Sequence, residues 1–230
     1  MKIVSWNCNG AFRKKHHALE EFNADILIIQ ECENPADSTI QFQKWTGENY
    51  LWIGSNKNKG LGLFSINGLK LNKLNWKDDN LELFLPFEVS GIPILAVWTK
   101  QANSPTFQYI GQLWKYLQLN NAQFIEHKPF VIGDFNSNAI WDVWDRWWNH
   151  SDVVGELSKL GIQSLYHHQH TEKQGGERVP TFYMHRNLSR PYHIDYVFLP
   201  ESYLLSACLE IGKPDRWLEH SDHVPLLLAQ

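Results

Sequence analysis

The amino-acid sequence predicts one α/β domain over residues 1–230, and three observations lead to this prediction. Short apolar runs typical of buried strands outnumber the segments of helical composition. Helical segments separate the strands in both halves of the chain, and no linker rich in proline, glycine or serine divides it. A length of 230 residues, with 43% hydrophobic and 20% charged residues, suits a single globular domain.

Ten short apolar runs have the composition and length of β-strands. Several of them end at a polar or acidic residue. In chain order the runs cover residues 2–6, 24–31, 60–65, 81–89, 91–100, 130–132, 181–183, 194–199, 203–209 and 224–228. We therefore expect strands to form most of the regular structure.

Three segments have helical character. The longest covers residues 105–126; it begins at a proline, which suits a first helical turn, and carries apolar residues at helical spacing. Residues 16–22 have helical composition. Residues 153–160 predict a short helix that ends at the following glycine.

Charge and composition restrict the classes of function. A net charge of −4 and a pI near 6.2 give no overall positive field, so a nucleic-acid ligand would need a local basic patch or a metal ion. No apolar run approaches the ~20 residues of a membrane helix, and the N-terminal run is too short for a signal peptide. Three widely spaced cysteines indicate reduced, buried thiols. We expect a cytoplasmic protein without membrane association, and no stable protein partner is implied.

Polar residues follow apolar strands at several places in the chain. They are Asn7, Glu31, Asp134, Asn136, Asp195 and residues 220–223. Side chains at the ends of rigid strands can project into one shared cleft, which is where α/β proteins build their sites. A single acid after a strand is usually a turn residue or a helix cap. Five or six such places in one domain favour a shared site.

The stretch PFVIGDFNSN, residues 129–138, places an acid and an amide close together at the end of a strand. If the strand stays extended, Asp134 and Asn136 point to one side and Phe135 packs on the other. Gly133 would allow a close approach of the backbone at the rim. A similar but weaker pattern occurs in IVSWNCN, where another apolar strand is followed by Asn-x-Asn. This repeated pattern fits two similar halves that meet strand end to strand end.

Four of these polar residues suit a metal ion and a phosphate group. Glu31 and Asp222 offer hard oxygen donors, which Mg²⁺ and Mn²⁺ prefer. Asn7 and Asn136 are neutral amides, which can hydrogen-bond a phosphate without repelling a nucleophile.

The other three suit proton transfer. Asp134 could orient and deprotonate a water molecule, and Asp195 with His223 could form a carboxylate–imidazole pair in which the carboxylate favours the imidazolium. Taken with the metal donors, these residues predict metal-assisted, in-line attack of water on a phosphoester.

Five sequence blocks resemble the signature blocks of the endonuclease/exonuclease/phosphatase superfamily. This superfamily includes deoxyribonuclease I, exonuclease III-type abasic endonucleases, inositol polyphosphate 5-phosphatases, sphingomyelinases and deadenylases. The blocks are SWNCNG (5–10), LIIQE (27–31), GDFN (133–136), HIDYVF (193–198) and SDHVPL (221–226). They occur in family order and span nearly the whole chain. The combination of QE, GDFN and SDH in this order is specific, although each block alone is weak.

The resemblance implies a DNase I-like fold, a four-layer α/β/β/α sandwich with the site at the junction of the two sheets. It also implies a divalent cofactor, Mg²⁺ or Mn²⁺. Glu31 resembles the principal metal ligand of the family, with Asn7 and Asp222 near the metal.

The same resemblance assigns roles in catalysis. Asp134 matches the residue that positions or activates water or protonates the leaving oxygen, and Asn136 matches the phosphate-orienting amide. His223 matches the histidine that contacts the scissile phosphate, with Asp195 as its acidic partner. Which residue acts as the base is disputed across the family, so we assign that role jointly to Asp134 and His223.

The chain departs from the family pattern at two places. Many members have a His or Tyr near the end of the middle strand, where this chain reads LAVWTKQ around Trp98. Lys100 could compensate electrostatically, or the leaving group could need no acid. Abasic endonucleases usually carry an acid two residues after the first Asn, where this chain has Asn9, which weakens that subfamily assignment.

Candidate substrate-binding residues combine positive charge with aromatic rings. They are Lys100, Arg178, Arg186, Trp98 and Tyr183. The segment that precedes Asp195 interleaves arginines with aromatics, a pattern that suits a phosphate and a stacked base. An ordinary surface hairpin is the alternative interpretation.

Two further clusters have simpler interpretations. The run WDVWDRWWNH, residues 141–150, holds several of the eleven tryptophans; it predicts either packing by large aromatics or a stacking surface for bases or sugars. His167, His168 and His170 lack a second ligand group at metal-site spacing, so we expect them in a loop.

These observations favour a divalent-metal-dependent phosphodiesterase, and among such enzymes a nuclease that acts on DNA or RNA. One alternative is a phosphatase or phosphodiesterase on a small-molecule or lipid phosphate, of the inositol phosphate or sphingomyelin type. Another is a catalytically silent nucleic-acid-binding module that keeps the fold.

Overall fold

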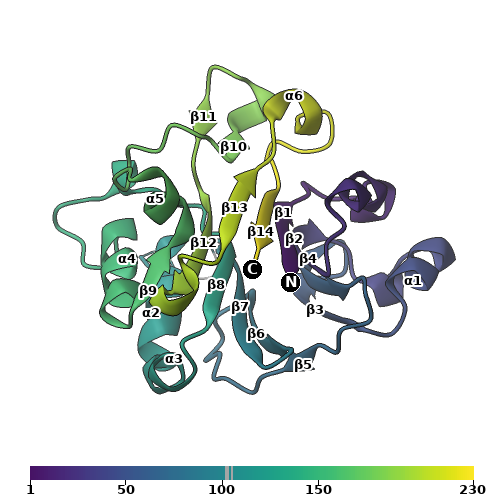
Figure 1. The fold of residues 1–230 in the computed structure, drawn as a ribbon, viewed down its shortest axis with the longest axis horizontal. Coiled ribbons are helices and arrows are strands. Elements are labelled where there is room, and N and C mark those ends of the chain that lie inside the picture. Colours follow the sequence, from purple (N-terminus) through teal and green to yellow (C-terminus); the bar gives the residue numbers. More distant parts are fainter. Residues whose placement is uncertain (102–103, 105) are drawn as a thin grey trace.

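Two six-stranded β-sheets pack face to face in the computed structural model, which describes residues 1–101, 104 and 106–230 (Figure 1). The first sheet contains, in spatial order, β13 (Cys208–Ile211), β14 (Leu226–Ala229), β1 (Lys2–Asn7), β2 (Ile26–Cys32), β4 (Lys59–Ser65) and β3 (Tyr50–Asn56). The second contains β5 (Asn72–Lys73), β6 (Phe84–Val89), β7 (Ile92–Trp98), β8 (Phe130–Asp134), β12 (Asp195–Pro200) and β9 (Ile162–Ser164). A two-stranded ribbon of β10 (Phe182–Tyr183) and β11 (Pro191–Tyr192) lies at the upper end of the view in Figure 1.

Helices cover the outer face of each sheet. The first sheet carries the 3₁₀ helices η1 (Phe12–Lys14) and η2 (His16–Phe22) and the α-helices α1 (Ile40–Thr46) and α6 (Pro214–Trp217). The second carries α2 (Ile110–Leu119), α3 (Asn121–His127) and α4 (His150–Lys159). Short elements between these are α5 (Leu165–His170), η3 (Pro35–Asp37), η4 (Ala139–Trp141), η5 (Met184–Arg186) and η6 (Glu201–Tyr203). The expected α/β/β/α sandwich is confirmed. Among the described residues, no helix is long and apolar enough to cross a bilayer.

Side-chain alternation along the strands decides which residues face the other sheet. Ile3 of β1 and Ile132 of β8 belong to the core between the sheets, whereas Val131 packs under the helices of the second sheet. Because alternate residues of a strand share a face, Asn7 and Asp134, the last residues of β1 and β8, also lie on the inner faces. Two polar strand ends are therefore directed into the junction between the sheets.

The two sheets have the same internal order. In each, one parallel pair, β1 with β2 and β8 with β7, is flanked on both sides by antiparallel neighbours. Read from β13 to β3 and from β9 to β5, the sequence of parallel and antiparallel neighbours is identical. This agrees with the expectation of two similar halves from the repeated Asn-x-Asn pattern.

Most expected strands form with small shifts at their ends, but some expectations were wrong. The single helix expected over 105–126 is divided at Asn120 into α2 and α3, and its proline at 105 lies outside the described residues. The strand expected over 203–209 begins only at Cys208, since η6 and a turn precede it. That cysteine is exposed, contrary to the expectation of buried thiols, although all three cysteines are free.

Other elements were missed or misassigned. The sequence analysis did not anticipate α1 and β3, and the helix expected over 153–160 begins earlier, at His150. The histidines at 167, 168 and 170 lie on helix α5 rather than in a loop. His167 is held there by Glu177, with 3.0 Å between Nε2 and Oε1.

Gly133 adopts a backbone conformation that other residues avoid. Its φ is 147°, and a Cβ atom built there would lie 1.9 Å from the carbonyl oxygen of Val97 on the neighbouring strand. The close approach of β8 to β7 just before Asp134 therefore requires glycine, as the sequence suggested.

We expect Gly133→Ala to lower the free energy of unfolding by at least ~2 kcal/mol, because the new Cβ must displace backbone. Urea denaturation measures the loss. Gly155→Ala is the matched control: Gly155 lies inside α4 with nothing near its missing Cβ, so alanine there should stabilise slightly. Equal stability of the Gly133→Ala variant and the wild type would contradict the steric argument.

Candidate active site

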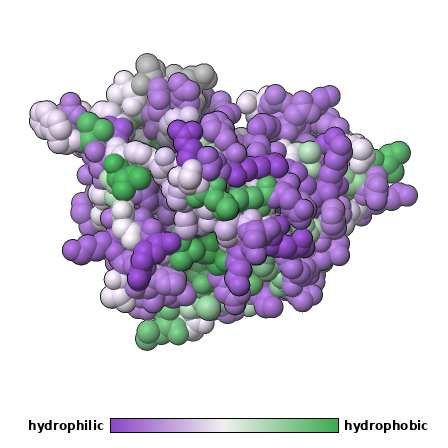
Figure 2. All heavy atoms as spheres, turned by 90° about the horizontal axis from the view of Figure 1, so that it is seen from above, coloured by the Kyte–Doolittle hydropathy of each residue, from purple (hydrophilic) through white to green (hydrophobic). Residues whose placement is uncertain are grey.

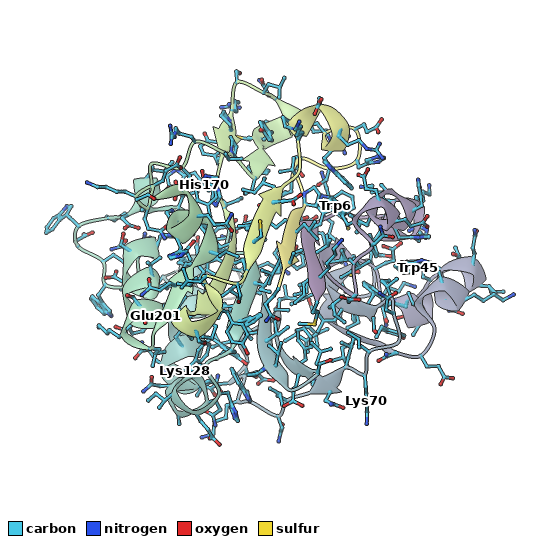
Figure 3. The ribbon with its side chains drawn as sticks, in the orientation of Figure 1. Trp6, Trp45, Lys70, Lys128, His170 and Glu201 are labelled. Atoms are coloured by element: carbon cyan, nitrogen blue, oxygen red, sulfur yellow. The ribbon has the colours of Figure 1, made fainter. Side chains whose placement is uncertain are left out.

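A buried hydrogen bond joins the two sheets at the ends of their central strands. The side-chain amide of Asn7 on β1 donates from Nδ2 to Oδ2 of Asp134 on β8 over 2.9 Å. Both side chains are almost fully buried. Figure 3 labels Trp6, which precedes Asn7, near the upper end of β1, whereas Lys70 and Lys128 mark the opposite end of the molecule.

Asp134 also organises the turn that follows β8. Its Oδ1 accepts from the backbone N–H of Asn136 at 2.8 Å, and its Oδ2 accepts from the Asn136 amide at 3.0 Å. The acid and the amide lie together, but the strand does not stay extended beyond Asp134, since Asn136 has a left-handed φ of 45°. The same amide donates to the carbonyl oxygen of Thr99, and Phe135 is buried under the helices as expected.

Asp195 and His223 form a buried carboxylate–imidazole pair. Nδ1 of His223 lies 2.9 Å and 3.2 Å from the two carboxylate oxygens of Asp195, so Nε2 is the nitrogen left for a substrate. Asp195 lies opposite Asp134 in the β12–β8 register, and its backbone N–H donates to Oγ1 of Thr181. The ring of Phe182 covers His223 with 4.6 Å between the ring centroids.

Asp134, Asp195 and His223 form a cluster of ionisable groups in which one nitrogen or oxygen atom of each side chain lies within 4.8 Å of the others. These groups shift one another's pKa values. Burial and the nearby Asp195 carboxylate raise the pKa of Asp134 to about 7. Burial alone would lower the pKa of His223, but attraction by Asp195 and the hydrogen bond to it outweigh that effect and raise the pKa to about 9. At neutral pH, His223 is therefore an imidazolium and Asp134 can exchange a proton.

Glu31 lies at the edge of this cluster, at a β-bulge in β2. A left-handed φ of 60° interrupts the side-chain alternation there, and its Oε1 accepts from the Asn7 amide at 3.4 Å. The ammonium group of Lys59 on β4 lies 2.5 Å from its Oε2. The sequence analysis missed Lys59, because a bulge hides from the sequence which residue of β4 faces Glu31.

Asp222 is linked to Asn7 through its neighbour. Ser221 donates from Oγ to the backbone carbonyl of Asn7 at 2.7 Å, and the same hydroxyl lies 3.4 Å from Oδ1 of Asp222. The backbone N–H of His223 donates to Ser221 Oγ. Ser221 thus positions both neighbours, a role that the sequence analysis did not assign.

The candidate substrate-binding residues differ in how accessible they are to a substrate. Trp98 ends β7 beside Asp134 but is buried in the core between the sheets, and Tyr183 is also buried. Lys100 extends over Trp98, with 5.5 Å to the ring centroid, and lies 4.0 Å from Glu82.

The two arginines of that set are both exposed. Arg186 donates to the backbone carbonyls of Glu219 and His220, just before Asp222. Arg178 pairs with Glu172, with 2.6 Å between Nε and Oε1, and among the described residues it contacts none of Asp134, Asp195 and His223. Its use by a substrate stays a prediction.

The donor set at the sheet junction suits a divalent cation. Glu31 and Asp222 are partly exposed carboxylates, and Asn7 contacts Glu31 directly and is linked to Asp222 through Ser221. The Lys59 ammonium on Glu31 shows that this carboxylate already attracts positive charge. Oxygen donors without thiolates favour Mg²⁺ or Mn²⁺ over softer metals.

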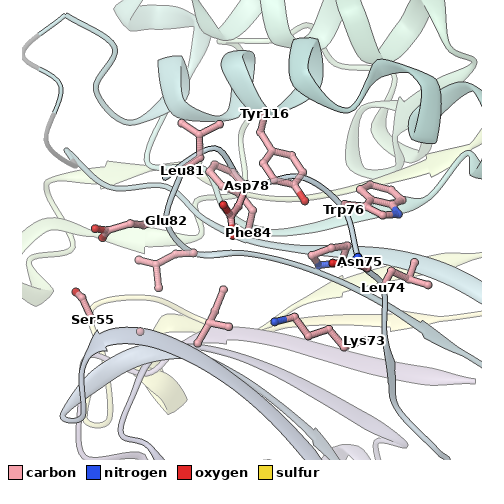
Figure 4. A pocket seen from close by; sticks show the side chains of 14 residues that line it. Ser55, Lys73, Leu74, Asn75, Trp76, Asp78, Leu81, Glu82, Phe84 and Tyr116 are labelled. Atoms are coloured by element: carbon pink, nitrogen blue, oxygen red, sulfur yellow. The ribbon is translucent and has the colours of Figure 1, made fainter.

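A separate cavity of about 280 Å³ opens between β3 and the segment that leads into β6 (Figure 4). Lys73, Trp76, Asp78 and Tyr116 are among the residues that line it. It contains none of the predicted site residues. Figure 2, which shows the molecule from above, has a mainly hydrophilic surface with hydrophobic side chains grouped near its middle.

Comparison with known proteins agrees with this architecture. The sequence model of the Endonuclease/Exonuclease/phosphatase family matches residues 4–223. No curated protein matches the sequence at a significant level.

Similar solved structures share the fold across the whole chain. The 3′-5′ exonuclease NExo from Neisseria meningitidis is 20% identical, with a TM-score of 0.76 and coverage of 100% of this chain and 99% of that one. The 3′ phosphatase NExo from Neisseria bound to a product DNA hairpin is 19% identical, with a TM-score of 0.70 and coverage of 100% of this chain and 98% of that one. An AP endonuclease from Archaeoglobus fulgidus is 20% identical, with a TM-score of 0.71 and coverage of 100% of this chain and 98% of that one.

We expect the free energy of unfolding to fall as the pH rises from 6.5 to 9. The folded protein keeps the His223 proton up to about pH 9, whereas the unfolded chain releases it near 6.5, so the stabilisation is complete below 6.5 and lost above 9. The full effect is at most ~3 kcal/mol. Asp134 acts in the same direction at lower pH, between its unfolded value of 3.8 and about 7.

Urea denaturation at a series of pH values, in EDTA, measures this slope. His223→Gln should flatten it between pH 6.5 and 9, because glutamine keeps a polar side chain but cannot titrate. An unchanged slope in the variant would show that other groups cause it.

Proposed function

The chain belongs to the endonuclease/exonuclease/phosphatase family of phosphoester hydrolases, and from this premise we propose that it is a divalent-metal-dependent nuclease. In this proposal it hydrolyses phosphodiester bonds of DNA or RNA by in-line attack of water. The observation that carries the proposal is the buried cluster of Asp134, Asp195 and His223, which two amides complete at the junction of the sheets.

Asp134 is proposed to handle the proton of the attacking water or of the leaving oxygen. A pKa near 7 lets a carboxyl group both accept and release a proton at neutral pH. The amides of Asn7 and Asn136 both donate to Oδ2 of Asp134, which fixes its orientation.

His223 is proposed to bind the scissile phosphate as an imidazolium. The Asp195 carboxylate on Nδ1 keeps the ring charged and leaves Nε2–H to donate to a phosphate oxygen. A charged donor in a buried site interacts strongly with the negative charge that develops in the transition state.

Mg²⁺ or Mn²⁺ is the proposed cofactor, held by Glu31 with Asn7 and Asp222 nearby. When bound, such an ion supplies Lewis-acid stabilisation of phosphate charge. Lys59 would then have to leave the Oε2 atom of Glu31 that it now contacts.

Nucleic acid is the proposed substrate class. Three similar structures carry the names exonuclease, AP endonuclease and 3′ phosphatase, and one of them is bound to a DNA hairpin. Exposed Arg186, which donates to the backbone carbonyls of Glu219 and His220 just before Asp222, supports a ligand with a phosphate backbone. Single-domain organisation over residues 1–230 is part of the same proposal.

A phosphatase acting on a small or lipid phosphate is the second candidate. The name 3′ phosphatase on one similar structure favours it, as do the exposed tryptophans in the loop before α4. A nuclease and a phosphatase would share the cluster and differ in how they hold the rest of the substrate.

We expect Mg²⁺- or Mn²⁺-dependent hydrolysis of a bis-aryl phosphodiester and of nucleic acid, with no activity in EDTA. Asp134→Asn and His223→Ala should each reduce turnover by about 100-fold or more, since each removes a proton-transfer or charge-stabilising group. A panel of single- and double-stranded DNA, abasic DNA, RNA, inositol phosphates and sphingomyelin identifies the substrate class.

Two exposed positions provide matched controls. Asp215→Asn and His168→Ala make the same changes on α6 and α5, away from the cluster, and should leave turnover unchanged. Activity that survives EDTA would refute the role of the metal. Near-normal rates in folded Asp134→Asn or His223→Ala would refute the assigned roles.

A further inference from the structure

One lysine ammonium group lies directly on the carboxylate that is proposed to hold the metal ion. Nζ of Lys59 is 2.5 Å from Oε2 of Glu31, and Oε1 of the same carboxylate accepts from the Asn7 amide at 3.4 Å. In the described part of the chain, no other lysine or arginine forms an ion pair with Glu31 or Asp222. Lys59 therefore places on Glu31 the positive charge that a divalent cation would bring.

The hairpin of β3 and β4 fixes the backbone of this lysine beside β2. Lys59 is the first residue of β4, and the next residue, Gly60, is covered by the ring of Trp52. A Cβ atom built at Gly60 would lie 2.3 Å from that ring, so only glycine allows this approach. Nε1 of Trp52 donates to the carbonyl oxygen of Cys32, the residue after Glu31. The backbone of Lys59 is therefore held next to Glu31, and only the end of its side chain is free to move.

The ion pair is exposed enough for another cation to replace the ammonium group. The Lys59 side chain is 53% exposed and the Glu31 side chain is 20% exposed. Water weakens an ion pair at such a position, so the pair contributes little to stability and separates readily. A divalent cation has twice the charge and binds several oxygen ligands at once, so it competes with the ammonium group for Glu31.

The acid next to this pair is already occupied. Glu33 is buried, and its carboxylate accepts from the backbone N–H groups of Phe12 and Arg13. The Arg13 guanidinium group also pairs with it at 2.8 Å. The turn of the hairpin, residues 56–58, contains two amides and another lysine but no acid. An ammonium group displaced from Glu31 is thus left for an anion that arrives at the site, and the substrate of a phosphoester hydrolase brings a phosphate.

We propose that Lys59 exchanges between two anions: it contacts Glu31 before the metal ion binds and the substrate phosphate afterwards. This inference rests on the proposed function and adds a substrate-binding residue to it. Metal ion and phosphate then bind cooperatively, because the phosphate draws away the ammonium group that competes with the metal ion. Such coupling is reciprocal, so the metal ion tightens phosphate binding by the same factor.

Binding of Mn²⁺ alone tests the first half of the exchange without turnover. Electron paramagnetic resonance of the free ion gives the dissociation constant with no nucleic acid present. Lys59→Met keeps a long side chain and removes its charge, so this variant should bind Mn²⁺ roughly fivefold more tightly than the wild type. Lys59→Arg keeps the charge and should stay close to the wild type.

Lys57→Met is the matched control for the loss of charge. Lys57 is an exposed residue of the same hairpin and forms no ion pair among the described residues. Its removal should change the affinity for Mn²⁺ by less than about twofold, because solvent and salt screen a charge that makes no contact.

Inorganic phosphate tests the second half of the exchange, with a protein-free titration to correct for Mn²⁺–phosphate complexes. Saturating phosphate should tighten Mn²⁺ binding to the wild type by roughly fivefold and to Lys59→Met by much less. With a bis-aryl phosphodiester, Lys59→Met should reach half-maximal turnover at a lower Mn²⁺ concentration but with a higher KM for the substrate. A residue with a purely structural role would not move these two constants in opposite directions.

Glu31→Gln separates the failure of this inference from the failure of the proposed function. If Mn²⁺ binds equally to the wild type and Lys59→Met while Glu31→Gln abolishes binding, the exchange is refuted and the role of Glu31 stands. Equal gains in Lys57→Met and Lys59→Met, or phosphate coupling that persists in Lys59→Met, would refute the exchange as well. If Glu31→Gln binds Mn²⁺ as the wild type does, the proposed metal site and this inference fail together.

Discussion

The hydrogen bond between Asn7 and Asp134 is the contact on which the rest of the proposed site depends. It is made where the inner faces of two separate sheets reach their rims, so it exists only when both sheets are folded and packed. Each central strand has one parallel and one antiparallel neighbour, which places Asp195 beside Asp134. The loop before β14 then adds His223. The proposed site is therefore assembled from residues that lie far apart in the chain.

Three ionisable groups in a buried cluster would be unstable without compensation. Burying an unpaired carboxylate costs several kcal/mol, so the cluster needs donors that satisfy both of its acids. Asn7, Asn136 and a charged His223 supply them. The same compensation underlies the chemistry proposed for the site, because it leaves Asp134 with a pKa close to neutrality and His223 with a stable positive charge.

Much of this arrangement could be predicted from the sequence, since alternation along apolar strands identifies the polar residues at their rims. The chemistry of those residues, with the five blocks, then indicated the family and the four-layer fold. Backbone details could not be predicted. The left-handed turn at Asn136 and the bulge at Glu31 each depend on one residue's dihedral angle, and the bulge decides that Lys59 contacts Glu31. The ring contact between Trp141 and Tyr192 joins distant segments and has no local signal.

The central claim is that Asp134, at the end of β8, and His223, in the loop before β14, act as one catalytic unit. Turnover of a bis-aryl phosphodiester at saturating Mg²⁺ tests it in a double-variant cycle with Asp134→Asn and His223→Ala. Residues that act together lose their joint effect when either is removed. The account predicts that the double variant is no slower than the slower single variant. Losses that multiply in the double variant would contradict it.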